Sequence, residues 1–126
     1  MKNLVNAPPP QRNPIDVPIV HIIYEVTVKF NRLVIKFPKS QRHSLGQTCN
    51  NSILYILEQV IAAANTLKPQ FKLQFLQNAS MKLDLLKILI RLCRDCECIS
   101  DNNYLEIQSQ LQQIGRMLGG WLKSIN

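Results

Sequence analysis

The chain has 126 residues, enough for one domain with a buried core, and its 46% hydrophobic content excludes a chain that is disordered throughout. Fifteen lysines and arginines against eight aspartates and glutamates give a formal net charge of +7, which favours a polyanionic partner, although solubility alone would also account for it. The most apolar stretch, residues 18–37, carries too many charged side chains to span a membrane, and no secretory signal is visible. We therefore expect a cytoplasmic protein whose four cysteines are reduced thiols.

Residues 1–17 are predicted to form a flexible, proline-rich N-terminal arm. Pro8, Pro9, Pro10 and Pro14 remove backbone donors and fix φ, so neither a helix nor a sheet propagates through them. The folded domain is therefore expected to cover residues 18–126.

The first predicted helix covers residues 18–37. Its β-branched residues are typical of a strand, but its apolar residues recur at intervals of three and four, which indicates a helix. Pro18 suits a helix start, and Pro38 ends the helix at the residue before it. The predicted core stripe consists of Ile19, Ile22, Ile23, Val26, Phe30, Leu33, Val34 and Phe37.

Three more amphipathic helices are predicted. The second begins with Ser40 as its N-cap and ends before Pro69, the third runs from about Pro69 to Cys98, and the fourth begins near Ser100. Their core stripes are Leu45, Cys49, Ile53, Ile56, Leu57, Val60 and Ala64; Phe75, Ala79, Leu83, Leu86, Ile90 and Cys93; and Tyr104, Ile107, Leu111, Ile114, Leu118, Trp121 and Ile125. Four long helices joined by short loops predict an all-α, up-down-up-down four-helix bundle.

Two of these helices carry more apolar surface than one bundle core needs. On the first helix the extra residues are Tyr24, Val28 and Ile35, and on the third they are Leu85, Ile88, Leu89 and Leu92. A surface helix of a monomer usually has a narrower apolar stripe, so we expect self-association, with a more fully buried third helix as the alternative.

The positive charge is concentrated in two helical stripes. The first consists of Lys29, Arg32 and Lys36, followed across the turn by Lys39 and Arg42. The second consists of Lys87, Arg91 and Arg94. Such stripes suit the phosphates of nucleic acid or an acidic protein surface. The alternative is a solvated polar face with local salt bridges such as Asp84–Lys87 and Arg91–Asp95.

No enzyme motif is found, and we expect neither catalytic residues nor a cofactor. His21 and His43 have no partners at triad or metal spacing; we expect His21 to cap or pack at the start of the first helix. Cys93, Cys96 and Cys98 raise the question of zinc, but the first two share a helix face and are expected to pack as small hydrophobic residues. Gly115 and Gly119, four apart, are expected to allow another helix to approach closely.

Three ordered blocks resemble the Avd family, the accessory proteins of diversity-generating retroelements. They are Phe37–Gly46 (FPKSQRHSLG), Lys82–Leu92 (KLDLLKILIRL) and Ile114–Ser124 (IGRMLGGWLKS). The resemblance runs from about Tyr24 to Ser124. A wider superfamily, which includes four-helix proteins encoded in ribosomal RNA intervening sequences, shares the fold, and the last block points to Avd within it.

The resemblance implies a four-helix bundle that assembles into a homopentameric barrel. It also implies a non-enzymatic role in mutagenic retrohoming, in which a basic surface engages the element's reverse transcriptase and its template RNA or cDNA. The positions that match the family's contact surface are Lys87 and Arg91, with Arg116 as a further candidate. The alternatives are a general nucleic-acid-binding or ribosomal-RNA-associated bundle, and a small metal or redox protein that uses the cysteines.

Overall fold

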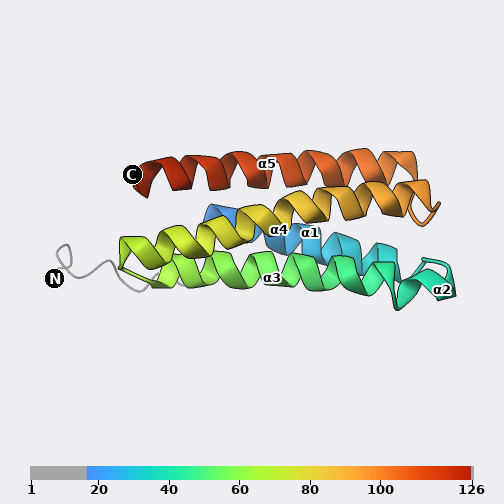
Figure 1. Cartoon of the computed structure of the whole chain (residues 1–126). Helices are drawn as coiled ribbons and strands as arrows, with labels where there is room; N and C mark the ends of the chain where they lie inside the picture. Colours follow the sequence, from blue (N-terminus) through green and yellow to red (C-terminus); the bar gives the residue numbers. More distant parts are fainter. Residues whose placement is uncertain (1–16, 126) are drawn as a thin grey trace, which may run out of the picture.

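A computed structural model describes residues 17–125, which contain four long helices and one short one and no strand. The helices are α1 (Pro18–Val34), α2 (Lys39–Arg42), α3 (Leu45–Asn65), α4 (Pro69–Asp95) and α5 (Asp101–Ile125). Consecutive long helices run in opposite directions, and α5 returns to pack against α1, so the predicted four-helix bundle is confirmed (Figure 1). The predicted arm lies outside the described residues except for Val17, the N-cap of α1.

The first helix begins at Pro18 as predicted but ends at Val34, three residues before the predicted end at Phe37. The N–H groups of Lys36 and Phe37 donate to the carbonyls of Leu33 and Val34 at 2.9 and 3.1 Å, which tightens the last turn. Because a residue before proline avoids the helical region, Phe37 leaves the helix and turns its ring into the core, edge-on to Phe30.

The prediction that one helix begins with Ser40 as its N-cap is wrong. Ser40 lies inside α2, and the chain bends at His43 and Ser44 before α3 begins. A Cβ on Gly46, in the first turn of α3, would lie 2.5 Å from Cγ2 of Val34. The backbone of this turn therefore packs directly against the end of α1, which requires glycine at this position.

The turn from α4 to α5 also differs from the prediction, because α4 ends at Asp95 and not at Cys98. Glu97 has a left-handed backbone with φ of 61°, and the N–H of Cys98 donates to the carbonyl of Cys93 at 2.8 Å. This is the Schellman arrangement that usually ends on glycine. The predicted cap of the next helix is confirmed, since the N–H of Asn103 donates to Oγ of Ser100 at 3.1 Å.

The core follows the predicted stripes, with Val20 of α1 as an additional buried residue and with a shift by one residue on each of two other helices. On α4 the fully buried residue is Leu76 and not Phe75, and on α3 it is Ala63 and not Ala64. Both shifts keep the spacing of three and four that faces the partner helices, and the displaced residues lie half-buried beside the core.

Candidate nucleic-acid interface

Helix α4 presents three faces, and one of them is basic. Its core face packs against α3 and α5, while Lys87 and Arg94 are half-buried and Arg91 is exposed on the side next to α5. The positions i, i+4 and i+7 of these three residues keep them within an arc of about 60°, as predicted. We call Lys87, Arg91 and Arg94 the α4 basic row.

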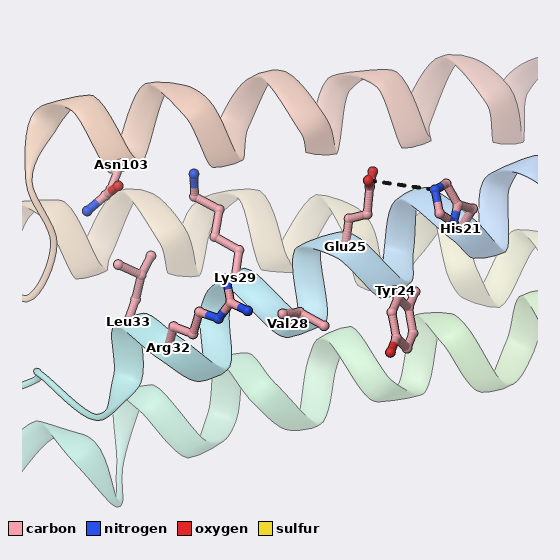
Figure 2. Close-up of a pocket in the computed structure, with 8 residues that line it drawn as sticks. All are labelled: His21, Tyr24, Glu25, Val28, Lys29, Arg32, Leu33 and Asn103. Atoms are coloured by element: carbon pink, nitrogen blue, oxygen red, sulfur yellow. Dashed lines mark ion pairs between the residues drawn. The ribbon is translucent and has the colours of Figure 1, made fainter.

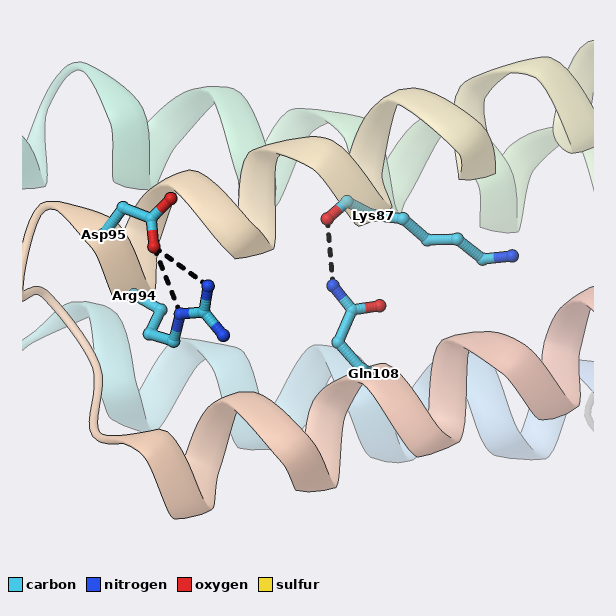
Figure 3. A network of polar contacts seen from close by, with 4 residues as sticks. All are labelled: Lys87, Arg94, Asp95 and Gln108. Atoms are coloured by element: carbon cyan, nitrogen blue, oxygen red, sulfur yellow. Dashed lines mark hydrogen bonds and ion pairs between the residues drawn. The ribbon is translucent and has the colours of Figure 1, made fainter.

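The structure brings Arg116 of α5 to this row at Lys87. The side-chain amide Nε2 of Gln108 donates to the backbone carbonyl of Lys87 at 2.9 Å, which fixes the antiparallel register of the two helices (Figure 3). Beyond that contact lies a groove of about 370 Å³ between α4 and α5. The residues lining this α4–α5 groove are Ser80, Leu83, Asp84, Lys87, Gln112, Gly115 and Arg116. The sequence predicted Lys87 and Arg116 as separate basic positions, and the packing of α4 against α5 brings them to one groove.

The three cations Lys87, Arg91 and Arg116 are not neutralised by their neighbours. Among residues 17–125, none of the three lies within ion-pair distance of a carboxylate. Neither predicted local salt bridge is formed among the described residues: Asp84 lies beyond ion-pair distance of Lys87, and Asp95 accepts from Nε and Nη2 of Arg94, at 3.1 and 3.0 Å, instead of pairing with Arg91 (Figure 3). These charges are therefore available to a partner.

Arg94 is held within the protein more tightly than the rest of the row. Besides its pairing with Asp95, its guanidinium lies over the ring of Tyr104 at 4.2 Å from the centroid. This cation–π contact ties the end of α4 to the first turn of α5. A partner that used Arg94 would have to share it with both of these groups.

The basic residues of the stripe predicted on the first helix lie in different environments. Lys29 pairs with Glu106 of α5, and burial lowers the pKa of its ammonium group below the ordinary lysine value. Arg32 and Lys36 are exposed near the end of α1, and Lys39 is exposed at the start of α2. The C-terminal ends of α1 and α4 lie at the same end of the bundle, so the two basic stripes share that end (Figure 1).

Arg42 differs from the other basic residues because it is half-buried under the turn between α1 and α2. Its Nη2 donates to the carbonyl of Phe37 at 3.5 Å, and its Nε is buried with no hydrogen-bond partner among the described residues. The side chain therefore supports the bend that brings Gly46 onto α1, and it presents less charge to a partner than Lys39 does.

The second apolar face of α4 is exposed, as the sequence predicted for Leu85, Ile88 and Leu92. Met81, which sequence reasoning missed, continues the same line at the spacing i, i+4, i+7 and i+11. The exposed fractions of Met81, Leu85, Ile88 and Leu92 are 71%, 42%, 66% and 43%. We call these four residues the α4 apolar stripe; Leu89, also predicted, is half-buried beside the core.

A second partly apolar surface lies along α1. Tyr24 and Ile35 are exposed and Val28 is half-buried, as expected for a face turned away from the core. A groove of about 570 Å³ follows this helix and reaches Asn103 of α5 (Figure 2). His21, which we expected to cap or pack, is exposed at the rim and pairs with Glu25 at 3.6 Å.

Of the two cysteines predicted to pack as small hydrophobic residues, Cys93 does so and Cys96 does not. Cys93 is buried with its Sγ 3.7 Å from Sγ of Cys49, whereas Cys96 is exposed and does not share this packing. The hydrogen bond with Cys49 and burial raise the pKa of Cys93 far above the ordinary thiol value. Metals bind the thiolate, so this environment opposes metal binding, and residues 17–125 contain no group of three potential ligands placed to hold a metal ion.

His43 and two glycines of α5 complete the residues singled out in the sequence. His43 lies at the C-cap of the short helix α2. Gly115 faces Leu83 and Lys87 of α4, but a Cβ on Gly119 would meet no described atom within 4 Å. Among the described residues, Gly115 but not Gly119 faces another helix.

A comparison with known protein families identifies the family of this chain. A family model described as bAvd-like matches residues 19–125. The chain belongs to the bAvd-like family. Among curated proteins, no match is found. The Avd family is an accessory, non-catalytic one, and none of the helices described here is both long and apolar enough to cross a membrane.

The three Avd-like blocks now have structural counterparts. The first, Phe37–Gly46, forms the bend from α1 into α3, where Gly46 packs against Val34. The second, Lys82–Leu92, carries most of the α4 basic row and the α4 apolar stripe. The third, Ile114–Ser124, supplies Gly115 and Arg116 to the α4–α5 groove. In this Avd-family chain, one block therefore shapes the bundle and two meet at its basic surface.

Proposed function

We propose that this chain is a non-enzymatic accessory protein of a diversity-generating retroelement, and that it binds the element's reverse transcriptase and its template RNA or cDNA in the cytoplasm to support mutagenic retrohoming. The observation that carries the proposal is that Lys87, Arg91 and Arg116 lie within Avd-like blocks and have no carboxylate at ion-pair distance among the described residues. Each such cation releases a condensed counterion when it contacts a phosphate. The reverse transcriptase performs the polymerisation, and this chain holds it on the template.

The active form in this proposal is a homo-oligomer, with five copies as the number that family membership suggests. The α4 apolar stripe supports this part of the proposal, because four exposed apolar side chains in one line are unfavourable in water. The exposed α1 residues Tyr24 and Ile35 offer a second apolar surface for a ring contact. A closed ring would repeat the basic row around its outside and so multiply the weak contact of a single chain.

Copurification with a cognate reverse transcriptase tests the proposal. We expect a stable complex whose mass by light scattering corresponds to about five copies of this chain. The double variant Lys87→Ala, Arg91→Ala should weaken binding to the polymerase and to RNA while its helical circular dichroism stays unchanged. Lys68→Ala with Lys123→Ala removes the same charge from other exposed positions and serves as the control.

The second candidate function is a general nucleic-acid-binding or ribosomal-RNA-associated bundle. The net charge of +7 supports it equally well. A chain that binds RNA but ignores the reverse transcriptase would favour this candidate over the Avd adaptor.

A further inference from the structure

The α4–α5 groove contains a glycine that helix packing does not explain. A Cβ on Gly115 would lie 3.5 Å from Cδ2 of Leu83 and 3.6 Å from Nζ of Lys87, which are ordinary contact distances. Alanine would therefore fit between α4 and α5, although glycine costs a helix interior about 1 kcal/mol relative to alanine. The missing side chain instead leaves the floor of the groove open beside the Lys87 ammonium group.

The groove brings together the donors that bind phosphate. Lys87 and Arg116 supply an ammonium and a guanidinium group from opposite helices, and Ser80 and Gln112 supply a hydroxyl and an amide. Asp84 is the one carboxylate in the lining, and it lies beyond ion-pair distance of both cations. The lining therefore carries two positive charges and one negative, and its volume of about 370 Å³ leaves room for a phosphate group with its water.

We propose that the α4–α5 groove binds one backbone phosphate of single-stranded nucleic acid, with Lys87 and Arg116 as its two cationic arms and Gly115 as its open floor. This inference rests on the proposed function and adds to it the place where the strand crosses the bundle. Arg91, one turn along α4 from Lys87, lies outside the groove and meets the neighbouring part of the strand.

Plugging the groove without changing its charge tests this site. Gly115→Leu fills the floor, whereas Gly119→Leu makes the same substitution one turn later on α5, where no described atom lies within 4 Å. The probe is a short, fluorescently labelled single-stranded RNA of mixed sequence, titrated over a range of salt concentrations. We expect Gly115→Leu to raise the Kd about tenfold and to reduce the salt slope by about 0.7, the value for one phosphate contact on a single strand. Gly119→Leu should bind like the unchanged protein.

Variants of Lys87 and Arg116 then test whether these two cations bind RNA through the groove. Lys87→Met and Arg116→Gln should each weaken RNA binding severalfold, and should weaken it little further in the Gly115→Leu background, because the phosphate has already been displaced. Asp84→Asn removes the carboxylate that repels the phosphate and should tighten binding. Circular dichroism melting checks the fold of every variant, and Gly115→Ala, with a smaller expected loss, replaces Gly115→Leu if leucine unfolds the bundle.

The outcomes separate this inference from the proposed function. If Gly115→Leu binds RNA as tightly as Gly119→Leu while Lys87→Met and Arg116→Gln weaken it, the cations act from the open surface and the groove site is wrong. The accessory role would survive that result. If the unchanged protein binds neither RNA nor reverse transcriptase, the proposed function fails, and the groove site fails with it.

Discussion

Gly46 sets how closely α3 approaches α1, and its replacement tests this contact. A Cβ at Gly46 would lie 2.5 Å from Cγ2 of Val34, whose branched side chain has little rotameric freedom. We expect Gly46→Ala to lower the free energy of unfolding by about 1–3 kcal/mol, as other overpacked core positions do. Gly120→Ala, with no described atom within 4 Å of its new Cβ, is the control and should be neutral or stabilising. Chemical denaturation at a fixed protein concentration measures both; equal stabilities would mean that the two helices can move apart.

Lys29 gives the stability a specific dependence on pH. Burial lowers the pKa of Lys29 below its ordinary value of 10.5, so between the lowered value and 10.5 the unfolded chain binds more protons than the folded one. The free energy of unfolding therefore rises with pH across that window, as the cost of burying the charged ammonium disappears. Lys29→Met removes this titrating group, so we expect the stability of the variant relative to the unchanged protein to fall as the pH rises through that window towards 10.5. Lys36→Met, which makes the same substitution at an exposed position, is the matched control in paired denaturation curves.

The turn between α4 and α5 places a non-glycine residue where helices usually end on glycine. Glu97 has a φ of 61°, so Glu97→Gly removes backbone strain and should raise the free energy of unfolding by about 1 kcal/mol. The same substitution at exposed Glu58, inside α3, should lower it by a similar amount, about 1 kcal/mol. A gain in unfolding free energy for Glu97→Gly together with a loss for Glu58→Gly would confirm the assignment of the turn. Two losses of stability would show that the Glu97 side chain contributes more than its backbone costs.

The helix boundaries show which signals in a sequence are local and which are not. Pro18, Pro69 and Ser100 act through the backbone beside them, and all three marked helix starts correctly. Ser40 is an equally good local signal, but α3 starts at Leu45, where its first turn packs Gly46 closely against Val34 of α1. That contact joins two helices, so no window of sequence along one helix contains it.

The distinction between signals within one helix and contacts between helices also applies to the surface of the whole molecule. Periodicity alone predicted the α4 basic row and most of the α4 apolar stripe, because both depend on one helix. The α4–α5 groove required the register of two helices. The ion pair of Lys29 with Glu106 and the packing of Arg94 on Tyr104 likewise required knowing which residues of α5 come near them. Charges that look equivalent in the sequence are therefore unequal in the bundle: among the described residues, Lys29 and Arg94 are paired with carboxylates, whereas Lys87, Arg91 and Arg116 are not.

The α4 apolar stripe gives the last prediction, which concerns assembly. Ile88 lies near the middle of the stripe and is 66% exposed, so Ile88→Glu places a charge inside any contact that covers the stripe without disturbing the core. We expect light scattering to show a large loss of oligomer mass while the circular dichroism remains helical, because burying an unpaired carboxylate costs several kcal/mol. Leu67→Glu, at an 88% exposed position in the turn before α4, should leave the mass unchanged. An Ile88→Glu protein that keeps its full mass would move the assembly contact to the α1 face around Tyr24, where Tyr24→Glu would then be the variant that dissociates it.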